Sequence, residues 1–137
     1  MRRPFRVISL APTQTEIIAA VGGLELLEGV TENCDFPEDV RWVPVFGSWH
    51  APDLRRVLDA QPDLVCTFGK HQEELSMALE ESGLRVYHSD PGDVPSSLKT
   101  IGEIGSILGC DQAARRLIDA LETRLDRVER ALGRRSP

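Results

Sequence analysis

Short runs of β-branched residues alternate with helical stretches along the whole chain. The clearest run spans residues 62–68, and the others are residues 6–10, 26–30, 43–46 and 84–87. Amphipathic stretches lie between them, for example residues 73–81, which Gly83 follows. This alternation with short connections predicts an α/β domain with a mostly parallel sheet of about four to five strands and flanking helices.

Local signals predict how individual helices begin and which way they face. Thr13 followed by Glu16 has the spacing of a capping box at the start of the first helix. Leu54, Val57 and Leu58 are predicted to face the core from a short helix after the third strand.

The last helix is predicted over residues 111–132 and is longer than a domain of this size needs. Its apolar residues recur at spacings of four and three, at Leu117, Leu121, Leu125, Val128 and Leu132. We therefore divide the chain into an α/β ligand-binding lobe over residues 1–110 and a long C-terminal helix over residues 111–137. The apolar stripe predicts a partner, and a homodimer through residues 113–132 is one alternative.

Charge and composition exclude several classes of protein. The 137 residues carry 16 Lys and Arg against 22 Asp and Glu, a net charge of −6, which disfavours a nucleic-acid partner. No apolar run approaches the roughly 20 residues of a membrane span. The apolar run after the basic start at residues 1–6 is too short for a secretory signal, so we expect a cytoplasmic protein as written, or a periplasmic or cell-surface one whose leader was removed.

Chemistry-bearing residues follow the predicted strands. In an open α/β sheet, ligands bind at the carboxyl ends of the strands. Trp49 lies just past a strand, where it is placed to contact a planar ligand; the alternative is that it covers the start of the next helix. Phe68 is a second such platform or a core residue, whereas Trp42 is expected to pack against the sheet edge. The predicted ligand-binding residues are Trp49, Phe68, Asn33, Asp35, His50 and Lys70.

Metal and enzyme interpretations are weaker. His50, His71 and Cys34 are residue types that bind zinc or copper, but their spacing matches no known metal motif, so no metal site is assigned. Cys34 with His50 imitates a nucleophile pair, yet the chain has no serine nucleophile elbow or phosphate-binding loop. We expect that the chain is not an enzyme and that it binds no catalytic cofactor.

Three ordered motifs carry a family resemblance. Residues 6–16 (RVISLAPTQTE), residues 29–37 (GVTENCDFP) and the block from Gly47-Ser48-Trp49 to residues 61–65 (QPDLV) resemble periplasmic-type binding proteins for vitamin B12, ferric siderophores and haem. The resemblance to the cobalamin-binding members rests on residues 34–37 and Trp49. It covers nearly the full chain and matches the N-terminal lobe of the helical-backbone class of these proteins.

The resemblance implies a non-catalytic ligand-binding domain like the substrate-binding component of an ABC importer for cobalamin or a related corrinoid. In that family two α/β lobes, joined by a long helix, clamp the ligand, and aromatic residues on the first lobe contact the corrin ring. Trp49 matches such a position, Phe68 falls near another, and Asn33 stands where some relatives have an aromatic residue. Alternatives are a dimerising or cytoplasmic interaction module, or a metal, siderophore or haem binder.

Two departures from the family pattern bear on its partners. Arg55 stands where the family has the glutamate that docks onto the permease, so docking to an ABC permease is doubtful. The chain also stops where a second lobe is expected to begin, and half a clamp is expected to bind its ligand weakly.

Overall fold

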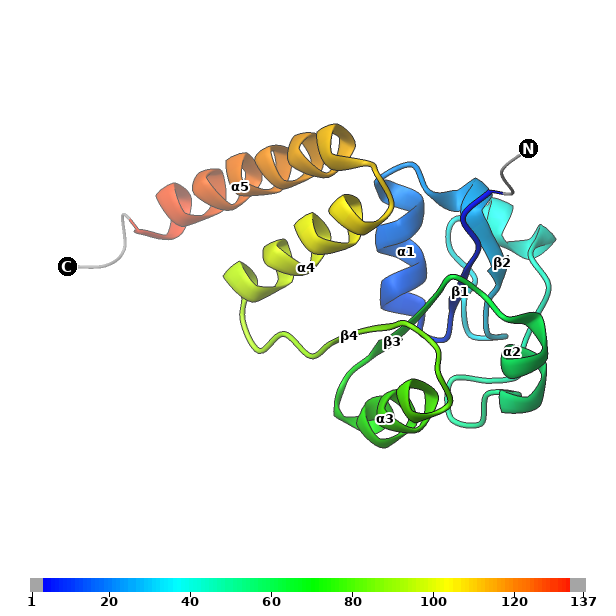
Figure 1. Cartoon of the computed structure of the whole chain (residues 1–137). Helices are drawn as coiled ribbons and strands as arrows, with labels where there is room; N and C mark the ends of the chain where they lie inside the picture. Colours follow the sequence, from blue (N-terminus) through cyan, green and yellow to red (C-terminus); the bar gives the residue numbers. More distant parts are fainter. Residues whose placement is uncertain (1–3, 134–137) are drawn as a thin grey trace.

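The computed structural model describes residues 4–133, which form a four-stranded parallel sheet with helices on both faces (Figure 1). The strands are β1 (Val7–Ser9), β2 (Leu27–Gly29), β3 (Leu64–Phe68) and β4 (Val86–Ser89), in the spatial order β2-β1-β3-β4. The helices are α1 (Pro12–Ala20), α2 (Leu54–Ala60), α3 (Glu73–Glu81), α4 (Val94–Ile107) and α5 (Asp111–Gly133). The predicted α/β class with a mostly parallel sheet is confirmed.

Successive side chains of the two central strands point to opposite faces of the sheet, so the molecule has two hydrophobic cores. Val7 on β1 and Cys66 on β3 face one cluster, in which they pack with residues of α1, α4 and α5. Ile8 and Val65 face the opposite side, where they pack with Val57 of α2 and with residues of α3. Because both faces are covered, the two central strands are buried along nearly their whole length, as parallel sheets require.

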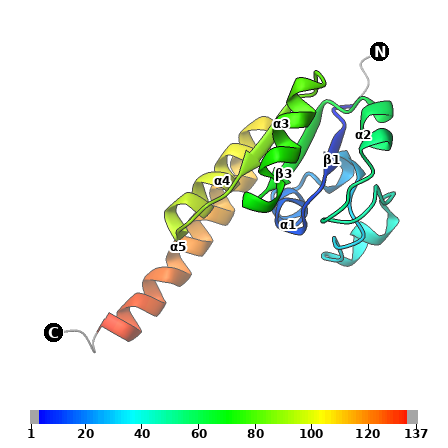
Figure 2. The ribbon, with the colours of Figure 1, turned by 90° about the horizontal axis from the view of Figure 1, so that it is seen from below.

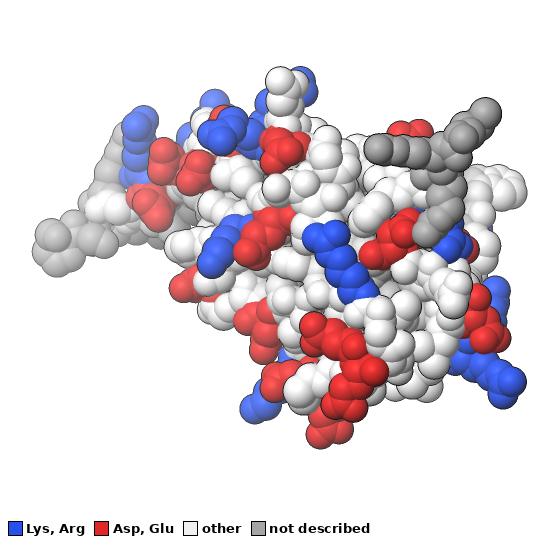
Figure 3. All heavy atoms as spheres, viewed as in Figure 1, with Lys and Arg blue, Asp and Glu red and all other residues white. Residues whose placement is uncertain are grey.

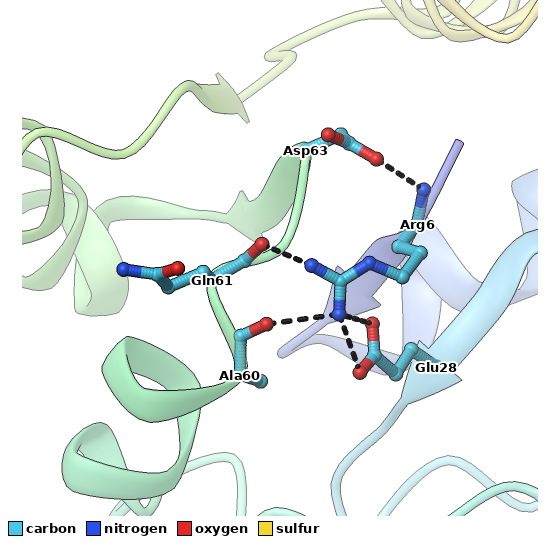
Figure 4. A network of polar contacts seen from close by, with 5 residues as sticks. All are labelled: Arg6, Glu28, Ala60, Gln61 and Asp63. Carbon is cyan, nitrogen blue, oxygen red and sulfur yellow. Dashed lines mark hydrogen bonds and ion pairs between the residues drawn. The ribbon is translucent and has the colours of Figure 1, made fainter. Parts of the chain in front are cut away.

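Arg6 joins three segments at the amino-terminal edge of the sheet (Figure 4). Its guanidinium pairs with Glu28 of β2 at 2.9 Å and donates to the carbonyl oxygens of Ala60 and Gln61. Its backbone N–H donates to Asp63 at 2.7 Å. This network ties β1 and β2 to the turn before β3 on the edge opposite the strand carboxyl ends.

Helices α4 and α5 form an antiparallel pair, and the turn between them contains Gly109 at φ +73. Figure 2 shows that the C-terminal part of α5 projects beyond the rest of the described chain. Its 23 residues agree with the predicted long helix, while residues 134–137 of that prediction lie outside the described residues. Within residues 4–133, no helix combines the length and the apolar character needed to cross a bilayer.

Several local predictions were wrong. Residues 43–46 form only an isolated bridge, between Val45 and Val30, because the proline in this run offers no N–H for a ladder. The first helix begins at Pro12 rather than being capped by Thr13, and its N-cap residue makes no side-chain hydrogen bond, so the predicted capping box is absent. The fourth strand lies two residues later than predicted, over Val86–Ser89.

Two predictions of burial were also wrong. On α2 only Val57 is buried, while Leu54 and Leu58 are each 39% exposed, because a seven-residue helix turns just one side to the sheet. Trp42 does not pack against the sheet edge and is 85% exposed.

Candidate functional site

Two side chains from neighbouring segments hold Trp49 at the carboxyl-terminal edge of the sheet through hydrogen bonds to the Trp49 backbone. Its N–H donates to Asn33 Oδ1 at 2.8 Å, and its carbonyl oxygen accepts from Gln72 Nε2 at 3.1 Å. The two partners come from the loop after β2 and from the 3-10 turn over Lys70–Gln72 that follows β3. Asn33 therefore supports the loop that carries the tryptophan ring.

Gln72 organises this edge, and the sequence analysis did not identify it. Its side chain is buried, donates to the carbonyl oxygen of Leu10 at 2.9 Å as well as to that of Trp49, and accepts from Phe68 N–H at 3.0 Å. A glutamine at the start of a helix is ordinary in sequence, so only its position four residues after a strand end could have drawn attention to it.

Trp49, His50 and His71 form one aromatic cluster. The Trp49 ring lies 5.1 Å from the His50 ring and 5.2 Å from the His71 ring, between centroids. His50 Nδ1 faces His71 Nε2 at 3.2 Å. The structure thus brings together two predicted site residues and the metal candidate His71 from loops that are 21 residues apart.

This cluster borders an open pocket of about 290 Å³. The remaining lining is mainly apolar and comes from the 47–53 loop, α2, the 3-10 turn before α3 and α3 itself, namely Ala51, Pro52, Leu54, Gln72 and Leu75. Trp49 Nε1 is shielded from solvent and has no hydrogen-bond partner among residues 4–133. The pocket therefore offers aromatic and apolar surface and two imidazoles.

The other predicted site residues lie outside this pocket. Asp35 and Lys70 are exposed, and Phe68 is half-buried at the end of β3; none of the three lines the pocket. Their role in ligand binding stays a prediction.

Cys34 is buried away from the histidine pair. Its sulfur accepts a hydrogen bond from Thr15 Oγ1 at 3.1 Å and lies 3.3 Å from Thr31 Oγ1. Within the part of the chain that the structure describes, no three His, Cys, Asp or Glu side chains gather into a group that can hold a metal ion. The contacts of Cys34 are thus structural, and the three-ligand arrangement with His50 and His71 is not formed.

A second polar cluster lies between α1 and the ends of β3 and β4. The buried Gln14 amide donates to the carbonyl oxygen of Thr67 at 2.8 Å and to Ser89 Oγ at 3.1 Å. Thr67 Oγ1 lies 2.8 Å from His88 Nδ1. Gln14 Oε1 and His88 Nε2 have no partner among the described residues. These contacts connect the first helix to the outer strand pair.

Acidic side chains lie on α3, the helix that contributes Leu75 to the pocket. Figure 3 shows acidic side chains gathered over α3, whose first turn carries Glu73 and Glu74. Hydrogen bonds from Ser96 lower the pKa of Asp93, the N-cap of α4. Burial raises the pKa of the Cys66 thiol to about 12, and burial together with a hydrogen bond to Glu103 raises the pKa of Tyr87. None of these three groups lines the Trp49 pocket.

Comparison with known sequences places residues 7–136 in one family, described as periplasmic binding protein. A curated relative from Vibrio vulnificus, named vitamin B12-binding protein, is 35% identical over 100 residues, which cover 72% of this chain and 35% of the relative. The chain thus spans only part of the length of that relative.

Solved structures share the fold. The periplasmic vitamin B12 binding protein of Vibrio cholerae superposes with a TM-score of 0.84 at 22% identity, covering 92% of this chain and 50% of that one. A periplasmic haem-binding protein from Pseudomonas aeruginosa superposes with a TM-score of 0.81 at 23% identity, covering 98% of this chain and 50% of the other. At these identities the likeness establishes the fold alone.

Proposed function

The chain belongs to the periplasmic binding protein family, and from that premise we propose that it supplies one half of a binding site for a corrinoid such as vitamin B12. The observation that carries the proposal is the placement of Trp49. Its ring is half-buried at the carboxyl-terminal edge of a parallel sheet, where α/β proteins bind ligands, and two neighbouring loops hold its backbone. We propose no catalytic step for this chain.

The size of the pocket supports a surface contact rather than enclosure. A volume of about 290 Å³ lies at the lower limit of pockets that enclose even a drug-sized molecule, and a corrinoid is much larger. The macrocycle would therefore lie across Trp49 and the surrounding loops, with its other face left for a second lobe. Residues 1–110 would act as this ligand-binding lobe and α5 as the helix toward the second lobe.

Calorimetric titration of the chain with cyanocobalamin tests the proposal. We expect measurable binding, weakened about tenfold or more in Trp49→Ala because a central aromatic contact is lost. Trp42→Ala is the matched control, since Trp42 is 85% exposed and does not line the pocket. No binding by the unaltered chain, or an equal loss in the two variants, would contradict the proposal.

A haem is the second candidate ligand. The exposed His50 imidazole beside Trp49 is a suitable axial ligand for haem iron, and the Pseudomonas aeruginosa protein that shares this fold is a haem-binding protein. Haemin added to the same chain distinguishes the two ligands. A shift of the haem absorption band that His50→Ala abolishes would favour haem over the corrinoid.

The proposed location and partner follow from the same premise. A corrinoid-binding member of this family would meet its ligand in the periplasm or at the cell surface and deliver it to an ABC permease. Arg55, exposed on α2, opposes that docking wherever the permease presents an arginine. We propose that Arg55→Glu strengthens any such docking.

A further inference from the structure

We propose that His50 Nδ1 and His71 Nε2 together bind a divalent transition-metal centre that has two adjacent open coordination positions. The site shares its pocket with the proposed function, but it does not depend on corrinoid binding. The metal belongs to the late first row, where imidazole is a preferred ligand.

The distance between the two nitrogens matches a shared metal. Imidazole nitrogens bind such metals at about 2.0–2.1 Å, so two of them at adjacent positions lie about 2.9–3.4 Å apart for bond angles between octahedral and tetrahedral values. His50 Nδ1 and His71 Nε2 lie 3.2 Å apart. Their separation can therefore stay as it is when an ion binds, while both rings turn so that their lone pairs point at the ion instead of at each other.

The surroundings hold both rings in place. The ring centroids of His50 and His71 lie 4.8 Å apart, and the Trp49 ring packs against both. Without a metal, one imidazole donates its N–H to the other. Metal binding requires the donating ring to carry its proton on its other nitrogen, which changes the tautomer without releasing a proton.

The remaining coordination positions must be filled from outside the protein. Among the described residues, no carboxylate or thiolate lines this pocket, and the side-chain amide of Gln72 is occupied by backbone groups. The metal therefore arrives either as a hydrated ion or in an open chelate that leaves two adjacent positions free. A planar macrocycle offers one position on each face, so only one of the two histidines can bind its metal.

The test uses the untagged chain with Trp42→Phe, so that Trp49 is the only tryptophan. Three probes are added separately: hydrated Ni²⁺, Ni²⁺-nitrilotriacetate with two open positions, and Ni²⁺-EDTA with none. We expect the first two to quench Trp49 fluorescence and the third to have no effect. His50→Ala and His71→Ala are each expected to weaken binding about tenfold or more, because a ligand should matter at least as much as an outer partner.

His88→Asn is the matched control, because it removes the third histidine of the chain and leaves the pair intact. Its amide can keep the contact that His88 Nδ1 makes with Thr67. Circular dichroism of each variant checks the fold. Because His50 and His71 are exposed, we expect the fold to tolerate the loss of either side chain.

Each outcome decides the proposal or the source of the metal. Quenching by hydrated Ni²⁺ and by the nitrilotriacetate complex supports a site open to ions and chelates, and quenching by hydrated Ni²⁺ alone identifies a free ion. The proposal is overturned if neither hydrated Ni²⁺ nor the nitrilotriacetate complex quenches the fluorescence, or if His50→Ala and His71→Ala bind as tightly as the unaltered pair. A failure to bind cyanocobalamin overturns the proposed function but leaves this site untouched.

Discussion

The side chain of Gln72 joins three backbone segments that lie far apart in the sequence. Replacing it with alanine leaves two carbonyl oxygens and one N–H without their partner, at Leu10, Trp49 and Phe68. We expect Gln72→Ala to lower the free energy of unfolding by about 1–3 kcal/mol, measured by urea titration. Gln112→Ala, on the exposed side of α5, is the control and should leave stability unchanged. Equal effects of both variants would contradict this role.

The three cysteines should differ in reactivity toward a thiol reagent. Cys34 and Cys66 are buried, whereas Cys110 is half-buried. We expect only Cys110 to react readily in the native chain, and all three to react after denaturation, as measured by the absorbance of the released chromophore. A second thiol that reacts fast in the native chain and is lost in Cys34→Ser would contradict this expectation and support the interpretation of Cys34 as a nucleophile.

Burial of Cys66 makes stability fall at alkaline pH. The pKa of its thiol rises from 9.0 to about 12 in the folded chain. Between these values the unfolded chain loses a proton that the folded chain keeps, so the unfolded state gains stability as the pH rises. The loss of stability begins near pH 9 and amounts to at most about 1.4 kcal/mol for each pH unit above it, whereas below pH 9 both states keep the proton and none is lost. Urea midpoints should decline above pH 9, and less steeply in Cys66→Ala; identical slopes would refute the assignment.

For individual residues, the sequence analysis proposed site residues whose amino-acid type is rare, and it missed residues whose importance lies in their hydrogen bonds. Trp49 and His50 were predicted because rare side chains follow a strand end. Gln14 and Gln72 were not, since a glutamine near a helix start carries no signal until the fold brings carbonyl oxygens to it. Trp42 was predicted to pack against the sheet edge, but it ends the 3-10 turn over Glu38–Trp42 and is 85% exposed.

The contact between α4 and α5 depends on a glycine. A Cβ at Gly105 would lie 2.3 Å from the Cβ of Ala114, far inside van der Waals contact. We expect Gly105→Ala to destabilise the chain by about 1–3 kcal/mol, because the helices must separate. A Cβ at Gly102 would meet Ile118 Cδ1 at an ordinary 3.5 Å, so Gly102→Ala should stabilise the helix by up to about 1 kcal/mol. Thermal unfolding of both variants checks the sign, and two changes of the same sign would contradict the packing.

Elements with one dominant signal were predicted well. The helix over Glu73–Glu81 agrees residue for residue, since an amphipathic stretch ends before Gly83, which takes a φ of +92. Where two signals compete the prediction was wrong: Pro12 begins the first helix although Thr13 and Glu16 offered a cap. The 43–46 run has β-branched residues, but Pro44 lacks the N–H that a longer ladder needs, so only the bridge between Val45 and Val30 forms.

The stripe on α5 is uncovered at its C-terminal end. Val128 is 53% exposed and Leu132 49% exposed, in the last two turns of α5. We expect the isolated chain to self-associate at tens of micromolar, because uncovered apolar helix surface drives pairing. Sedimentation velocity measures this, with Val128→Glu/Leu132→Glu expected to remain monomeric. A monomeric unaltered chain would exclude the homodimer through residues 113–132.

Whole-molecule properties were predicted unevenly. The alternating pattern was enough to assign the fold class, while the absence of a nucleic-acid partner, expected from the net charge of −6, stays a prediction. The extent of the binding surface was not predictable, since a pocket of about 290 Å³ arises only when the 47–53 loop and the segment that follows β3 converge. The identity of the ligand depends on the surface formed at the carboxyl-terminal edge of the sheet, and no local sequence pattern predicts that surface.

The order of strands in the sheet differs from the order in which a ribosome makes them. β1 is synthesised first yet lies inside the sheet, paired with β2 on one side and with β3 on the other. Its second neighbour begins only at Leu64, so one edge of β1 stays unpaired while the intervening chain is translated. A nascent chain that pauses before β3 is complete would leave this edge of β1 open to chaperones or to other nascent chains.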